Sequence, residues 1–284
     1  MFIRFLILNK VVIFLTATVK IINNYRIQAT FPIRIPSKYK DIISKNNEFK
    51  NCHKDTRAFV IASGPSLKNQ DLAKLEGELI FSVNSFFKHK DIKKLNPQYI
   101  FFLDPNLFNS TTINKSDFYA KARDLYNNAF FFLPLFRGYK AVTKNHILPL
   151  DQCRFVAFGG MEECSNFDLD VLMPNIHGVG AFALSSAVYM GCNPIYLLGF
   201  DHDYFANRGI NHHFYEGSTV DIPKYVEPKL GDRVPYDEEM ISHYYLWRNY
   251  RNILKVAKNK GIQIYNSTDG GYLDIFELKS FEDL

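Results

Sequence analysis

The feature that most constrains the fold of this chain is the stretch from residue 58 to residue 67. Five residues of strand character, 58–62, lead into a Ser-Gly-Pro-Ser turn at Ser63–Ser66, and residues 69–75 then have a helical pattern. This order of strand, turn and helix is typical of the start of a nucleotide-binding α/β domain. A continuous apolar run indicates a parallel strand buried on both faces. The stretch therefore predicts a Rossmann-like α/β fold, with a mostly parallel sheet and helices on both faces.

The rest of the chain repeats this alternation of apolar runs and helical patterns. The runs end in polar or turn-forming residues, and Gly261 stands where a long helix should close. Strands are expected at residues 78–84, 98–104, 129–135, 153–158, 194–201 and 262–266, and helices at 117–127, 181–191 and 238–260.

The segments at either side of this pattern suggest appendages to one main domain. Residues 1–56 are expected to form an apolar amino-terminal segment and a linker, and residues 57–284 the nucleotide-binding domain. The polar excursion at about 205–237 is too long for a simple connection, which predicts a lid-like insertion. Residues 1–20 are apolar but interrupted by Arg4 and Lys10. They predict either a helix lying peripherally on the inner membrane or an accessory helix packed on the domain.

Composition excludes some classes of protein. The net charge of +5 is spread along the chain without a concentrated basic block, which argues against a nucleic-acid partner. The four cysteines have no metal-ligand spacing, and the chain has no convincing secretory signal. We therefore expect reduced thiols in a cytoplasmic protein.

Residues able to bind a ligand follow most of the predicted strands. In a doubly wound sheet these strand ends share one edge, so their side chains should converge on one crevice. A single polar residue at a strand end is more often a turn former or a helix cap, but several together favour a site. The residues concerned are Ser63, Gly64, Asn84, Asp104, Asp201, Asn266 and Ser267.

The turn at Ser63–Ser66 differs from both familiar phosphate loops. It has neither the three-glycine dinucleotide spacing nor a Gly-Lys-Ser/Thr ending. It retains a glycine that permits close backbone approach, and amides at a helix start that suit a phosphate. A second glycine pair, Gly178 and Gly180, leads into the helix expected at 181–191, and we assign it to nucleotide binding too.

The triplet Asp201-His202-Asp203 allows two interpretations. Carboxylates in this spacing hold a divalent metal on a diphosphate in many nucleotide-sugar transferases. Alternatively, Asp201 caps the following turn and His202 points away from the crevice.

Four further residues carry groups suited to proton transfer or substrate contact. His212, His213 and Tyr215 lie in the excursion, where they could contact substrate as a lid closes. His243 lies near the start of the long helix, where an imidazole could take a proton from a sugar hydroxyl near neutral pH. Its alternative role is that of an aromatic-like filler.

These motifs resemble two related groups of bacterial proteins. The residues at 62–67, 84–87, 104–108, 185–191 and 195–201 look like those of CMP-sialic-acid sialyltransferases of lipooligosaccharide loci. They look even more like the MptE-like (6-hydroxymethylpterin pyrophosphokinase-like) proteins of surface-polysaccharide clusters. That resemblance covers about residues 57–277 and includes the segments at 201–203, 213–215, 243–247 and 265–271.

The resemblance to the sialyltransferases implies roles for particular residues. Those enzymes bind CMP with the Gly-Pro-Ser turn and the Asn after the second strand, and use a His before the last long helix as base. The matching positions here are Ser63, Gly64, Pro65, Ser66, Asn84 and His243. Asp104 replaces an Asn of those enzymes, Asn106 belongs to the same motif, and Asp203 and Tyr204 fall where they carry a catalytic aromatic pair.

The leading hypothesis is a glycosyltransferase that transfers a sugar from a nucleotide-sugar donor, which could be CMP-linked, to a glycan or glycolipid acceptor without a metal cofactor. The alternative is a Mg²⁺-dependent pyrophosphokinase of the 6-hydroxymethylpterin type, with Asp104, Asp201 and Asp203 on the metal. A third hypothesis is a non-catalytic nucleotide- or glycan-binding protein.

Overall fold

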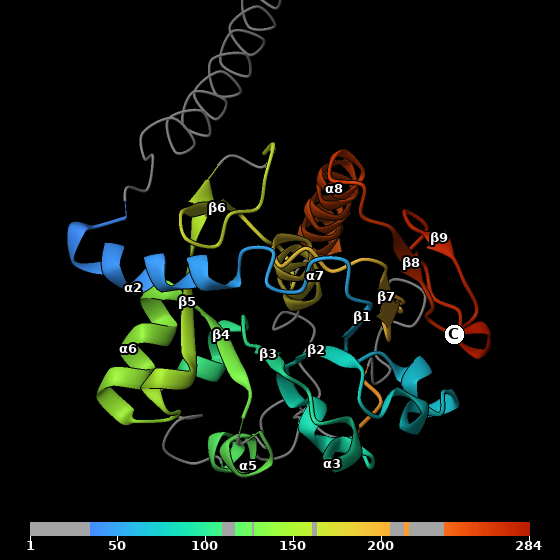
Figure 1. Cartoon of the computed structure of the whole chain (residues 1–284), viewed down its shortest axis with the longest axis horizontal. Helices are drawn as coiled ribbons and strands as arrows, with labels where there is room; N and C mark the ends of the chain where they lie inside the picture. The colour runs from blue at the N-terminus through green and yellow to red at the C-terminus, as the bar shows by residue number, and fades with distance from the viewer. Residues whose placement is uncertain (1–34, 110–116, 127, 161–163, 205–212, 216–235) are drawn as a thin grey trace, which may run out of the picture.

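A twisted parallel sheet forms the centre of the molecule (Figure 1). The computed structural model describes residues 35–109, 117–126, 128–160, 164–204, 213–215 and 236–284. Within these residues nine strands pair in the order β6-β5-β4-β3-β2-β1-β7-β8-β9, and every pairing is parallel. The strands are β1 (Ala58–Ile61), β2 (Leu79–Val83), β3 (Tyr99–Phe101), β4 (Phe130–Pro134), β5 (Cys153–Gly160), β6 (Leu172–Pro174), β7 (Ile195–Leu198), β8 (Ile264–Asn266) and β9 (Glu277–Leu278). The predicted α/β fold is confirmed.

The continuous apolar runs exist because both faces of the sheet are covered. In β1, Phe59 and Ile61 pack into one hydrophobic core, while Ala58 and Val60 pack into a second core on the opposite face. All four side chains are fully buried. A strand in this position cannot alternate apolar and polar residues, since successive side chains point to opposite faces.

Helices cover both faces, as Figure 1 shows for α3, α5 and α6 on one side and α7 and α8 on the other. Their bounds are α2 (Lys40–Ser44), α3 (Ile92–Leu95), α5 (Phe118–Leu125), α6 (Leu135–Asn145), α7 (Val179–Tyr189) and α8 (Tyr236–Asn259). Small residues on α7 let it lie close to the sheet, and Ala181, Ala183 and Ala187 are fully buried there. Gly261 follows α8 with φ 72°, as the sequence predicts for a residue that closes a helix.

The prediction of one continuous helix at 69–75 is wrong. Two short 3₁₀ helices, η3 (Pro65–Asn69) and η4 (Leu72–Leu75), stand in its place. Gln70 separates them in an extended conformation, and its side-chain amide donates to the carbonyl of Ser267 at 2.7 Å. Asp71 then caps η4 by accepting from the Ala73 amide. The chain uses its polar groups here for loop contacts and not for a continuous helix.

The segment before β1 is also different from the expected linker. Residues 37–49 form η1 (Ser37–Tyr39), α2 and η2 (Lys45–Phe49). Asn46 is completely buried, and its amide donates to the carbonyls of Phe155 and Leu169 at 2.8 and 2.7 Å. This segment therefore packs on the β5 side of the sheet as part of the folded unit.

The strand order reverses beside β1, and this reversal determines where a ligand can bind. Strands β2 to β6 follow on one side of β1, whereas β7 to β9 lie on its other side. Ala58 pairs with Leu79 of β2 and with Ile195 of β7. In open α/β sheets the ligand crevice lies outside the carboxyl ends of the strands at this point.

Two predicted appendages lie outside the described residues. These are residues 1–20, expected to be a peripheral or accessory helix, and most of the lid-like excursion, of which only 213–215 and the start of α8 are described. Among the helices that are described, none is both long and apolar enough to cross a membrane.

Candidate functional site

A cavity of about 260 Å³ lies at the reversal of strand order. We call it the switch-point pocket. Its walls come from the carboxyl ends of β1, β2 and β7, from the amino-terminal end of α7 and from one side of α8. The predicted site residues that line it are Ser63, Gly64, Gly178, Gly180, Asp201, Asp203, His213 and His243. Residues far apart in the sequence thus meet at one site.

Hydrogen bonds to the Asp201 side chain fix the Ser63–Ser66 turn in place. The carboxylate of Asp201 accepts from the backbone amide of Ser66 at 2.9 Å and from the Ser66 hydroxyl at 2.7 Å. Burial raises the pKa of Asp201, and the hydrogen bonds from Ser66 oppose this rise because they stabilise the charged form. The side chain of Asp201 thus bonds to the turn after β1, whereas most of the turn that follows Asp201 lies outside the described residues.

The pair of hydrogen bonds between Asp201 and Ser66, which we call the clip, requires a residue without a side chain at position 64. No special backbone angle requires it. Its φ of −63° is open to any residue. However, a Cβ at this position would overlap the Oδ2 of Asp201 and lie 2.5 Å from the carbonyl oxygen of Gly199. The close approach that the sequence indicates is thus an approach to Asp201 and to the end of β7.

The loop after β8 supports Asp201 from its other side. The Tyr272 amide donates to the carbonyl of Asp201 at 2.8 Å, and the Phe200 amide donates to the hydroxyl of Thr268 at 3.1 Å. At Gly271, where φ is 84°, a Cβ would lie 2.7 Å from the Asp201 carbonyl oxygen. Asp201 is therefore fixed by contacts on both sides.

The start of α7 presents backbone amides to the pocket. Gly178 precedes the helix with φ 153°, and a Cβ on Gly180 would lie 2.8 Å from the ring of Phe200. Both glycines line the pocket together with His177 and Val179. The first amides of a helix have no partner within it and carry the positive end of its dipole, so this wall suits a phosphate.

His243 lies in the second turn of α8, on the pocket side. Its Nδ1 lies 2.9 Å from the carbonyl oxygen of Glu239, one turn earlier in the helix. A carbonyl can only accept, so Nδ1 carries the proton and the Nε2 of the neutral ring carries the lone pair. The ring also contacts the rings of Tyr204 and Trp247.

His202 does not point away from the crevice, in contrast to one interpretation of the triplet. It lines the pocket, and its Nε2 lies 2.9 Å from the Tyr250 hydroxyl. Burial, reinforced by the proximity of His243, lowers the pKa of His202 to about 4. His202 is therefore neutral at pH 7, and it adds no positive charge beside His243.

Two hollows adjoin the switch-point pocket. One, of about 790 Å³, contains Asp104 and Arg137 and shares His177, Gly178, Val179 and Ser242 with the pocket. The other, of about 590 Å³, we call the aromatic groove; it is lined by His202, Met240, His243, Tyr244, Trp247, Arg251 and Tyr272. His202 and His243 line both the pocket and the aromatic groove.

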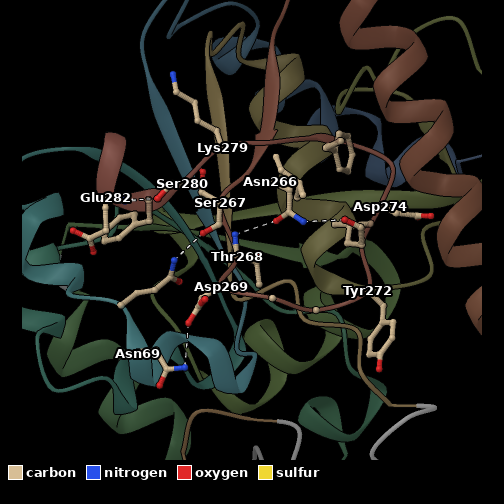
Figure 2. Close-up of a pocket in the computed structure, with 17 residues that line it drawn as sticks. Asn69, Asn266, Ser267, Thr268, Asp269, Tyr272, Asp274, Lys279, Ser280 and Glu282 are labelled. Atoms are coloured by element: carbon tan, nitrogen blue, oxygen red, sulfur yellow. Dashed lines mark hydrogen bonds between the residues drawn. The ribbon is translucent and has the colours of Figure 1, made fainter.

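Several predicted site residues do not line the pocket. Asn266 and Ser267 lie in a separate polar pocket of about 870 Å³ after β8 (Figure 2). There the Asn266 side chain organises its own turn, accepting from the Thr268 amide and donating to the Leu273 carbonyl. Asp104 caps η6 (Pro105–Phe108) by accepting from the Asn106 amide at 2.8 Å, and Asn106 is exposed. The side chains of Asn266 and Asp104 are thus those of a turn and of a helix cap.

The other predicted site residues lie beside the pocket or outside the described residues. Tyr215 is buried, and its ring stacks on that of His213 with centroids 4.9 Å apart. Its neighbour Phe214 donates its amide to the Ser63 carbonyl, so this short segment packs on the end of β1. Pro65 and Ser66 lie in the clipped turn, outside the lining of the pocket. His212 lies outside the described residues.

Asn84 stands directly after Val83, which lines the pocket. Its backbone has φ 46°, a left-handed conformation that Asn tolerates better than most residues. The side chain is 8 % exposed, and its Oδ1 has no hydrogen-bond partner among the described residues. A buried acceptor without a partner is costly, and a donor on a ligand could remove that cost.

The three carboxylates considered for Mg²⁺ do not fit a common ion. Asp104 lines the larger hollow, whereas Asp201 directs its carboxylate at Ser66. Within the described part of the chain, no three His, Cys, Asp or Glu side chains are grouped as metal ligands. The arrangement thus does not build the metal site of the pyrophosphokinase hypothesis from these residues.

Some residues of the site were missed in the sequence. His177 lines the pocket; its amide donates to Asn249 of α8 at 2.7 Å, and its ring stacks on Tyr245. Tyr250 and Ser242 also line the pocket. Tyr250 lies two turns after His243 on the same helix, and this spacing could have indicated it, since such residues share a helix face; Ser242 directly precedes His243 and carried no such signal.

Comparison with known proteins places the chain in a family. A family model described as 6-hydroxymethylpterin diphosphokinase MptE-like matches residues 34–207, more than half of the chain. A comparison with curated proteins gives no match. The matched segment begins before residue 57, in agreement with the packing of residues 37–49 on the sheet, and it includes the clip formed by Ser66 and Asp201. The chain belongs to the MptE-like family.

Proposed function

We propose that this protein is a glycosyltransferase that uses a nucleotide-sugar donor in surface-polysaccharide or lipooligosaccharide assembly. The observation that carries the proposal is the position of His243, which lines both the switch-point pocket and the aromatic groove. A base at the border of two hollows is suited to join two substrates, one in each. The sequence resemblance to sialyltransferases, in which this position is the base, supports the same role.

The roles in the pocket follow from its chemistry. The backbone amides at the start of α7, beside the turn at Ser63–Ser66, are donors for the phosphate of the donor. The Nε2 of His243 takes the proton of the acceptor hydroxyl as the acceptor oxygen bonds to the anomeric carbon. The bond from that carbon to the phosphate oxygen breaks, and the nucleotide leaves with the electron pair. The reaction needs no further reactant.

The family description supports a second candidate, a diphosphokinase that transfers diphosphate from ATP to a hydroxymethylpterin-like alcohol. Its chemistry depends on a divalent metal to neutralise the transferred phosphates. Metal dependence therefore separates the two candidates.

The test measures nucleotide release from a panel of CMP-, UDP-, GDP- and dTDP-sugars, with and without EDTA. The proposal predicts release from at least one sugar donor, unaffected by EDTA. His243→Gln should lower the rate by about 100-fold or more, the usual contribution of a general base. Lys255→Gln, an exposed change on the same helix, is the control and should leave the rate unchanged. AMP formation from ATP with 6-hydroxymethylpterin, abolished by EDTA, would instead establish the diphosphokinase.

A further inference from the structure

The aromatic groove is unusual for a surface in water. Tyr244, Tyr272 and Met240 line it and are 56 %, 58 % and 52 % exposed. Trp247 completes it, and its indole nitrogen donates to Asp274 at 3.2 Å. Exposed apolar side chains gathered in one concavity are typical of a ligand-binding groove.

The chemistry of the groove suits a sugar ring. Sugars have an apolar face of C–H groups and a rim of hydroxyls, so they stack on the electron-rich faces of aromatic rings. Arg251 lines the same groove and offers charged donors to hydroxyls or to a carboxylate. The polar partners required at the rim are thus present beside the aromatic faces.

The groove also continues at both ends. At one end it meets the switch-point pocket through His202 and His243. At the other end Tyr272 also lines the polar pocket of Figure 2, where its ring extends away from Asn266 and Ser267. That pocket contains Asn69, Asp269 and Lys279, which are groups that bind hydroxyls. A chain of two or more sugars could therefore run from His243 across Tyr272.

We propose that the aromatic groove binds the acceptor glycan, with its terminal sugar on Tyr244 and Trp247 and the preceding sugar over Tyr272. This inference rests on the proposed function for the identity of the ligand as an acceptor. An anionic membrane surface is the other occupant to consider. The acidic start of α8, Asp237, Glu238 and Glu239, precedes the groove residues and disfavours anionic headgroups.

Trp247 allows a direct test, because it is the only tryptophan in the chain. Its fluorescence is measured while the full-length protein is titrated with lactose, maltose, chitobiose and sialyllactose. We expect at least one of these to change the emission. Tyr244→Ala and Tyr272→Ala should each weaken that binding by roughly 2- to 10-fold, the contribution of one aromatic contact. Tyr236→Ala, an exposed tyrosine of α8 outside the groove, should leave it unchanged.

The outcomes separate this inference from the proposed function. No change of emission with any of the saccharides would overturn the inference, as would a change produced by phosphatidylglycerol vesicles alone. Nucleotide release that is acceptor-dependent but equally fast in Tyr244→Ala at every acceptor concentration would overturn the groove and leave the transferase in place. Saccharide binding without any turnover of a sugar donor would support the groove and contradict the transferase.

Discussion

At the scale of single residues, the site depends on one buried carboxylate. Asp201 is 7 % exposed, and both of its oxygens bond to Ser66, across 135 positions of sequence. A carboxylate taken out of water is stable only where donors replace its hydration. We therefore regard Asp201 as a positioning residue for the turn and not as a metal ligand or catalytic group.

A double-mutant cycle measures this clip. Ser66→Ala removes the hydroxyl donor and should cost about 1–3 kcal/mol of the free energy of unfolding, because a buried charge loses a partner. Asp201→Asn should cost less in the Ser66→Ala background than in the wild type, with a coupling energy of about 0.5–3 kcal/mol in chemical denaturation. Additive costs would show that the two side chains act independently.

His202 makes a second prediction at this scale, through pH. Its folded-state pKa of about 4 lies below the ordinary value of 6.5, so the unfolded chain binds the extra proton first as the pH falls. The free energy of unfolding therefore has its full value, as far as His202 is concerned, above pH 6.5. It decreases by up to about 3 kcal/mol as the pH falls from 6.5 to 4.

The measurement is urea unfolding between pH 7.5 and 4.5. His202→Asn, which tolerates the φ of 49° found there, should be less stable at pH 7 but should lose less stability on acidification than the wild type. His146→Asn is the matched control, since His146 is exposed and has a φ of 50°. An equally steep acid loss in His202→Asn would contradict the assignment.

At the scale of elements, α2 and η2 belong to the folded unit. Asn46 bonds to two backbone carbonyls of the sheet side, and Glu48 pairs with Arg154 of β5 at 2.6 Å. Asn46→Ala should lower the free energy of unfolding by about 1–3 kcal/mol, because two buried carbonyls lose their donor. Ser44→Ala, at an exposed position of α2, should change it by less than about 0.5 kcal/mol. Equal effects of the two changes would mean that the segment contributes little to stability.

The elements also show which parts of the fold the sequence can reveal. The strands β1 to β5, β7 and β8 and the helices α7 and α8 were predictable, because their apolar runs and periodicity reflect burial directly, whereas the three-residue strand β6 was not expected. The segment at 37–49 was not, since its contacts are made with distant parts of the chain: Asn46 bonds to Phe155 and Leu169, Glu48 pairs with Arg154, and Ile43 and Phe49 enter the two cores. The replacement of the 69–75 helix by η3 and η4 depends on Gln70 reaching Ser267, a contact 197 positions away.

At the scale of the whole molecule, strand order determines which predicted residues meet. Ser63, Asp201 and His243 converge because β1 and β7 are neighbours and α8 packs beside α7. Asn266 stands at the end of β8, much as Asp201 stands after β7. However, β8 lies one strand farther from β1 than β7 does, so the side chain of Asn266 lines another pocket. Residue type predicts that a strand end is polar, whereas the order of strands is a property of the assembled sheet.

The central claim is that a nucleotide binds at the switch-point pocket, and a thermal-shift measurement tests it most directly. Cytidine, uridine, guanosine and adenosine nucleotides are added to the wild type and to Asn84→Gly, each with and without EDTA. The variant keeps the left-handed backbone and removes the buried amide beside the pocket.

One nucleotide at about 100 times its Kd should raise the Tm of the wild type by roughly 5–10 °C, with or without EDTA. Asn84→Gly should reduce that shift. The absence of a shift with every nucleotide, or an unchanged shift in Asn84→Gly, would contradict the account.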